Sequence, residues 1–280
     1  MADWRGQSQE NSIAIRFGVK MNKYAILTLA LTLAVPFAAV AAERPDWFSR
    51  TTLLEKSVER SRAITLAEAR REAEASRSEV YKKLIDAGLE EDVAKEQIAK
   101  MTAALDAEFK KLAGDSAYKL GDAADLEFLF QLLYLANNDD DSQEAARIIK
   151  KMFPDASVVK AALSPEASAD FKKALAAMYD KIRPAADDQK SWIGLMNPPS
   201  ERNEIKIYGA TTEEIIANKG VVAKEFPGGA VELAKSALRM GIRFYEVEMV
   251  QPGEESGTKF HLFFWDGIQW RMLGPAWRAL

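Results

Sequence analysis

The chain of 280 residues contains no cysteine. Disulfides, thiol nucleophiles and cysteine-based metal sites are therefore excluded. Lipid attachment at a cleavage-site cysteine is excluded for the same reason. The fold must be held together by burial of apolar side chains, without a covalent cross-link.

Histidine is almost as scarce, because His261 is the only one. Any Ser–His–Asp or Cys–His arrangement would have to use it. Strand alternation places His261 on an apolar sheet face, so we expect a packed histidine with one hydrogen bond. The glycine-rich phosphate and dinucleotide motifs and the HExxH zinc motif are missing as well. The sequence therefore predicts no cofactor and singles out no catalytic residue.

One acidic stretch, residues 137–144, has oxygen-bearing side chains at positions 1, 3 and 5 of a calcium loop. It lacks the glycine that such a loop needs at position 6, and Ile148 stands where position 12 needs glutamate. We interpret the stretch as a solvated turn between helices, and the sequence predicts no metal site.

The longest apolar run lies near the front of the chain, at residues 25–40. Lys23 precedes it, and Ala39-Val40-Ala41 ends it with the small residues that a signal peptidase recognises. The sequence predicts a signal peptide over residues 21–41, preceded by an N-terminal extension or a misassigned start over residues 1–20. We expect an exported protein, periplasmic or extracellular, with no stable membrane anchor after cleavage.

The chain has no excess of positive charge, because 42 acidic residues outnumber 38 basic ones and give a net charge of −4. Without residues 1–42 the chain has 34 basic and 40 acidic residues, after four basic and two acidic ones are removed. An acidic chain with no basic stripe argues against a nucleic-acid partner. We expect an unknown protein or small molecule as the partner.

The remaining chain changes character once. Residues 42–183 show helical periodicity, with Ile98, Met101, Leu105, Phe109 and Leu112 on one face of a helix. No second copy at a fixed period supports a helical repeat, so we expect a bundle-like α-helical domain. Residues 184–203 hold three prolines and are predicted to be a linker. The fold class predicted for the whole is α+β.

The C-terminal domain, residues 204–280, is predicted to be a small α+β domain with an antiparallel β-meander. Strands are expected at 204–210, 242–250, 258–265 and 268–273, and a helix at 228–241. Asp266-Gly267 predicts a two-residue hairpin turn. That turn and a Val250–Thr258 pairing would set the register of the meander.

This register divides the sheet into two faces. One face is apolar, and we expect the helix at 228–240 to cover it. The other face is the candidate ligand or partner face, and it mixes apolar and charged residues: Phe244, Glu246, Glu248, Phe260, Leu262, Gln269 and Arg271. Glu246 and Arg271 are predicted to pair across Leu262. Such a face must be covered by the helical domain, by a second subunit or by a ligand.

The leading hypothesis is an exported, non-catalytic binding or interaction protein. It would act through this mixed sheet face and through the exposed faces of the amphipathic helices. The alternative is a hydrolase- or isomerase-like enzyme with a carboxylate-lined pocket on the same sheet. There Glu246, Glu248 and Arg271 would serve in acid–base chemistry or anion binding.

Overall fold

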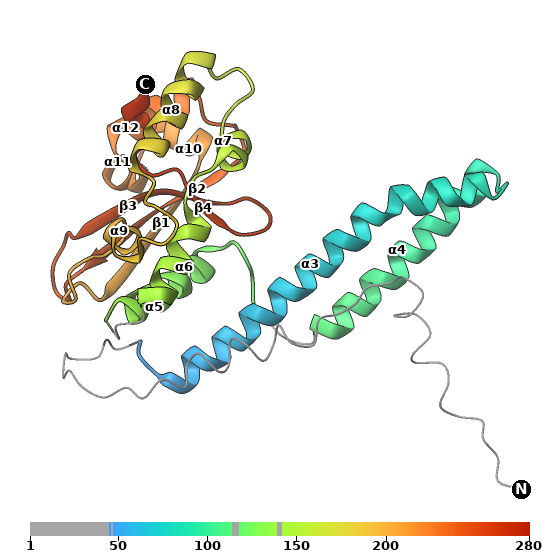
Figure 1. Ribbon diagram of the computed structural model, residues 1–280, viewed down its shortest axis with the longest axis horizontal. Helices are drawn as coiled ribbons and strands as arrows, with labels where there is room; N and C mark the ends of the chain where they lie inside the picture. Colours follow the sequence, from blue (N-terminus) through green and yellow to red (C-terminus); the bar gives the residue numbers. More distant parts are fainter. Residues whose placement is uncertain (1–44, 46, 114–117, 139–141) are drawn as a thin grey trace, which may run out of the picture. The chain divides into compact units, whose positions relative to one another are not determined.

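Figure 1 shows the computed structural model, which describes residues 45, 47–113, 118–138 and 142–280. The predicted extension and signal peptide lie outside these residues. The described chain falls into two compact units. Residues 49–113 with Tyr118 belong to the first unit, called the arm, and residues 119–280 with the short segment at Trp47 belong to the second, called the body. No helix within the described ranges is long and apolar enough to cross a bilayer.

The arm consists of two helices, α3 (Arg50–Asp86) and α4 (Glu91–Ala113). They run in opposite directions, with a turn at Gly88, whose positive φ of 88° suits the end of a helix (Figure 1). An ion pair between Arg70 and Asp106, 2.7 Å apart, joins the two helices. The arm is therefore a helical hairpin.

The predicted apolar stripe of α4 forms most of the seam of this hairpin. Ile98, Met101, Leu105 and Phe109 are half-buried, whereas Leu112 is 43% exposed. Among the arm side chains that the structure describes, only Leu53, Ser57 and Ala94 are buried. Two helices with one seam leave much apolar surface in contact with water.

The body contains all the strands and the shorter helices of the described chain. Its first part is helical: α5 (Ala123–Asn138), α6 (Ser142–Met152), α7 (Ala156–Ala162), α8 (Ala169–Ile182) and α9 (Gln189–Gly194). Its second part is mixed: β1 (Glu204–Thr211), α10 (Thr212–Ala217), α11 (Val221–Glu225), α12 (Gly228–Ser236), β2 (Arg243–Val250), β3 (Thr258–Trp265), β4 (Trp270–Met272) and the 3-10 helix η1 (Ala276–Ala279). The α+β prediction is confirmed, with helices dominating the N-terminal part and strands the C-terminal part.

The four strands form one antiparallel sheet in the order β1-β2-β3-β4. Helix α5 covers the apolar face, where Phe130 packs against Phe260 and Phe263 with ring centroids 5.7 and 5.3 Å apart. Helices α8, α10 and α12 lie on the other side of the strands (Figure 1). The prediction that the 228–240 helix covers the apolar face is therefore wrong. Helix α5 takes that place because it is apolar nearly all round.

The turn between β3 and β4 also differs from the prediction. Trp265 pairs with Trp270, so the loop has four residues, 266–269, and the two-residue turn is wrong. The Asp266 carboxylate accepts hydrogen bonds from the backbone N–H groups of Ile268 and Gln269, both at 2.8 Å. This side chain organises a longer loop in the way that aspartate stabilises Asx turns. The change of two positions keeps each β4 side chain on its predicted face.

The pairing of β2 with β3 contains an irregularity that the sequence did not predict. Thr258 pairs with Met249, one residue away from the expected Val250, and the register shifts by one between Val247 and Tyr245. The extra residue in β3 makes a β-bulge. Side chains of β3 on the Thr258 side of the bulge therefore lie on the opposite face from the one predicted.

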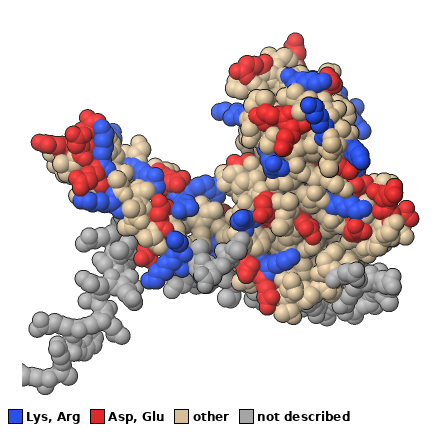
Figure 2. Space-filling model, turned by 180° about the vertical axis from the view of Figure 1, so that it is seen from behind, with Lys and Arg blue, Asp and Glu red and all other residues tan. Residues whose placement is uncertain are grey.

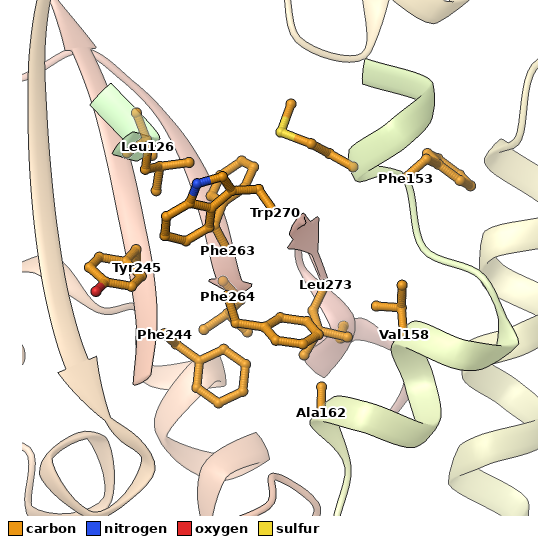
Figure 3. Packing of buried hydrophobic residues seen from close by; sticks show 14 of the residues in the cluster. Leu126, Phe153, Val158, Ala162, Phe244, Tyr245, Phe263, Phe264, Trp270 and Leu273 are labelled. Carbon is orange, nitrogen blue, oxygen red and sulfur yellow. The ribbon is translucent and has the colours of Figure 1, made fainter. Parts of the chain in front are cut away.

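The hydrophobic core is continuous through the body. Trp270 is 1% exposed and packs edge-on against Tyr245 and Trp265. Figure 3 shows Trp270 beside Phe263 and Leu126, while Phe264 of the opposite face points toward Leu273 and Val158. The indole nitrogen of Trp270 donates a 2.7 Å hydrogen bond to Asp125 at the start of α5.

The boundary between the units lies between Tyr118 and Lys119, and not in residues 184–203 as predicted. Helices α5–α9 share one core with the sheet, which joins them to the body. The predicted linker is packed as well, since α9 buries Trp192 and Met196 follows it into the core. A proline-rich composition indicated a linker, but its apolar residues anchor it to the body.

The arm is an insertion into the body. Before the arm, the Trp47 indole donates a 2.8 Å hydrogen bond to the Asn203 carbonyl and packs edge-on against Tyr134. After the arm, the chain re-enters the body at Lys119. Both ends of the insertion therefore belong to the same folded unit.

Replacing residues 50–117 with a Gly/Ser linker of about 15 residues is expected to leave the body folded. The described core cluster contains no residue of the arm, so its excision removes none of that packing. Near-ultraviolet circular dichroism and urea unfolding measure the result. Loss of the cooperative urea transition in the excised chain would contradict the insertion.

Candidate functional site

The candidate face of the sheet is covered by the chain itself. Phe244, Glu246, Glu248 and Leu262 are buried, and Phe260 lies on the opposite face beside Val247. Cover by the chain is one of the alternatives that the sequence left open for this face, and with it these residues do not form an open surface for a ligand or partner. The second side of the sheet is closed by the helices that follow β1 and by the C-terminal segment (Figure 1).

Arg271 and Gln269 lie at the β3–β4 end of the sheet, apart from Glu246. The guanidinium of Arg271 is 2.7 Å from Asp266 and 3.5 Å from Asp155. The predicted Glu246–Arg271 pair is therefore wrong, because Asp266 of the same loop engages the arginine. The structure thus separates Arg271 from the two glutamates of the predicted carboxylate-lined pocket.

Glu246 pairs with the only histidine instead. Its carboxylate lies 2.5 Å from Nδ1 of His261 and accepts a 3.2 Å hydrogen bond from the backbone N–H of Leu262. The Glu246 side chain is completely buried, whereas that of His261 is 25% exposed. Burial raises the pKa of the Glu246 carboxyl above its usual range, and the interactions with His261 offset this only in part.

The bulge in β3 creates this pair. Leu262 has a φ of +55°, an uncommon conformation for a residue with a branched side chain. With regular alternation, His261 would lie on the apolar face, where the sequence analysis placed it. The extra residue brings its ring to Glu246, and no glycine or other local signal in β3 marks the bulge.

A second charged cluster is centred on the ammonium of Lys259. The ammonium nitrogen lies 2.7 Å from the Glu225 carboxylate of α11 and 3.7 Å from that of Glu248. The centroid of the Tyr208 ring is 5.8 Å from the same nitrogen. Burial opposes the charge, but the two carboxylates raise the pKa of Lys259. Burial and the nearby Glu225 also raise the pKa of Tyr208. The positive charge of Lys259 also acts on Glu246, where it favours the ionised carboxylate and partly offsets the rise in pKa caused by burial.

The C-terminal segment closes the site. The Trp277 ring of η1 packs edge-on against His261, with centroids 5.1 Å apart. On its other side Trp277 presses against Gly229 of α12, where an added Cβ would overlap the indole. The site therefore combines a carboxylate-bound imidazole, an ammonium between two carboxylates, and two partly exposed aromatic rings, Tyr208 and Trp277.

This arrangement is suited to proton transfer, because a carboxylate fixes one nitrogen of an imidazole that reaches solvent. Within the described part of the chain, no group of three or more potential ligands is placed to hold a metal ion. No protein-family model matches the chain, no curated protein is significantly similar in sequence, and no solved structure matches its fold. The functional argument therefore rests on the geometry of this chain.

The buried carboxylate makes stability depend on pH. A carboxyl whose pKa is raised on folding contributes stability below its unfolded pKa, and that contribution is lost as pH rises through its folded pKa. Glu246→Gln, which is neutral at every pH, is expected to become more stable relative to the wild type as pH rises above about 4.5. Each unit of pKa shift corresponds to about 1.4 kcal/mol.

Urea unfolding of both chains between roughly pH 4, where an ordinary glutamate titrates, and about pH 7 tests this. Glu232→Gln on the exposed side of α12 is the matched control and should follow the wild-type profile. Parallel profiles for Glu246→Gln and the wild type would contradict the assignment.

Proposed function

We propose that the protein is an exported binding protein that engages a protein partner through exposed apolar side chains of its arm. This role requires no catalysis. The observation that carries the proposal is the distribution of large exposed hydrophobic residues. Five of the ten in the described chain lie on the arm, although the body is much longer: Leu54, Val58, Ile85, Val93 and Leu112.

These side chains belong to the arm, in which few of the described side chains are buried. Leu54 and Val58, 42% and 50% exposed, are one helical turn apart and therefore share a face of α3. Apolar residues gathered on a surface are typical of interaction sites, whereas single ones are ordinary. The sheet face that the sequence favoured is covered by the body, which leaves the arm as the better-supported binding element.

Charge supports recognition by apolar contact over electrostatic attraction. On the side of the molecule seen in Figure 2, lysine and arginine are interspersed with aspartate and glutamate on both units. A surface of mixed sign gives little long-range steering of a charged partner.

Capture of partners from a periplasmic extract by the chain from residue 42 onward tests the proposal. Leu54→Ser with Val58→Ser is expected to lower capture by about tenfold, as loss of apolar contact residues does in other interfaces. The matched control is Val221→Ser with Ile268→Ser, two similarly exposed positions on the body. Equal capture by the arm variant and the wild type would count against the proposal.

A further inference from the structure

Beyond partner binding, we propose that Glu246 and His261 form a proton-transfer site that hydrolyses an uncharged carboxylic ester. His261 is the catalytic residue and Glu246 is a positioning residue. The activity belongs to the body alone and does not depend on the arm. Failure of either proposal therefore leaves the other intact.

The first argument is the unfavourable free energy of the arrangement. A carboxylate with no exposed surface is costly to bury, and a well-packed apolar pair is often as stable as a buried ionic one. Leu262 adds backbone strain at the same point of β3. Strained backbone and β-bulges are found preferentially next to functional sites, where they redirect a side chain. Here the redirected side chain is His261.

The second argument is the geometry of the imidazole. Nδ1 is held at 2.5 Å by a carboxylate that also accepts the Leu262 N–H, so ring and carboxylate are both fixed. In the neutral ring, the proton on Nδ1 points to Glu246, and Nε2 keeps its lone pair. None of the described residues forms a hydrogen bond with Nε2, and a quarter of the side chain is exposed. A buried carboxylate that orients an imidazole in this way defines a general base.

The third argument concerns the substrate. Glu225 and Glu248 outnumber the single ammonium of Lys259, so the surroundings of His261 disfavour an anionic ligand. The partly exposed rings of Trp277 and Tyr208 offer apolar and aromatic contact. These groups fit a small uncharged ester with an aryl or apolar part.

In the reaction, Nε2 of His261 takes a proton from a water molecule while the water oxygen bonds to the acyl carbon. The π electrons of the carbonyl move to its oxygen and form a tetrahedral anion, beside the positive imidazolium that forms in the same step. As this collapses, the bond from the acyl carbon to the alcohol oxygen breaks, and the departing oxygen takes the proton from Nε2. The products are a carboxylic acid and an alcohol, and the imidazole is regenerated. Above the raised pKa of its carboxyl, Glu246 is ionised and offsets the positive charge of the imidazolium.

The test measures hydrolysis of p-nitrophenyl acetate by the chain from residue 42 onward. General-base catalysis contributes about 10²–10⁴-fold, so His261→Gln is expected to lower kcat/KM by about 100-fold or more. Lys235→Gln, an exposed change on α12, is the control and should keep the full rate. A chain no faster per mole than N-acetylhistidine, or His261→Gln with more than half of the rate, would overturn the proposal.

Glu246 is tested by separating kcat from KM, because a purely structural role would not change kcat alone. Glu246→Gln removes the negative charge beside the forming imidazolium, so kcat is expected to fall by about tenfold with KM nearly unchanged. An unchanged kcat would contradict the positioning role. Where this variant does not fold, ethoxyformylation of the single histidine in the wild-type chain replaces it. Modified protein should lose the activity, and retention of the rate would overturn the proposal.

Discussion

Trp270→Ala is expected to lower the free energy of unfolding of the body by about 3–5 kcal/mol. The indole is almost completely buried and contacts Tyr245 and Trp265 edge-on. Its removal leaves a cavity between α5 and the sheet that the rigid neighbours fill only in part. It also removes one donor from the buried carboxylate of Asp125, which accepts a hydrogen bond from the Gly121 N–H as well.

Trp270→Phe separates the two contributions. The phenyl ring loses the hydrogen bond but leaves a smaller cavity than alanine does, so a smaller loss of about 1–3 kcal/mol is expected. Urea unfolding followed by far-ultraviolet circular dichroism measures both variants. A loss of less than about 1 kcal/mol for the alanine variant would mean that Trp270 does not anchor α5 to the sheet.

Gly229→Ala is expected to cost about 1–3 kcal/mol, because overpacking forces rigid neighbours to move. A Cβ at this position would overlap Trp277 at the inner part of its indole, which cannot bend away as a flexible side-chain end can. The displaced ring would also leave His261, so both the packing of η1 and the cover of the candidate site depend on this glycine.

The neighbouring glycine is a matched control. An added Cβ at Gly228 meets nothing within 4 Å, so Gly228→Ala is expected to leave stability nearly unchanged. Unfolding by urea gives the stability, and tryptophan fluorescence, with a Trp277→Phe chain as the reference that identifies the contribution of this ring, reports its displacement. Equal stabilities for the two alanine variants would show that the close approach at Gly229 is not a constraint.

Much of the fold was predictable because its signals are local. The bounds of β3 were predicted to the residue, and those of β1 and β2 to within one residue. Runs of alternating or β-branched residues bounded by turn residues carry that information. The apolar stripe of α4 was confirmed except at Leu112. Helical periodicity identifies the apolar face of a helix, but it does not show how far the partner helix covers that face.

The candidate site was not predictable in full because it depends on one extra residue in β3. Period-two alternation assigned Glu246 and Glu248 to the same face, and they do lie near one another through Lys259. The same alternation placed His261 on the other face, since it cannot register a bulge at Leu262. Likewise Asp266 determined the partner of Arg271 through a loop whose length the Asp-Gly pair did not predict.

The predicted boundary between the two domains is wrong for a different reason. Prolines between residues 184 and 203 are typical of a linker, but Trp192 and Met196 are buried in the body. Amino-acid composition indicates the local backbone preferences of a segment, but it does not show whether the segment packs against the rest of the protein. The insertion of the arm depends on Trp47, far from its contacts in sequence, and such long-range contacts leave no periodic pattern.

The binding role of the arm is tested most directly with the complete chain from residue 42 and the arm-excised chain as baits in a cross-linked periplasmic extract. At least one protein is expected to be enriched about tenfold or more on the complete chain, because the exposed apolar residues of the arm carry the contact. Capture of the same proteins in the same amounts by a folded, arm-excised chain would contradict it.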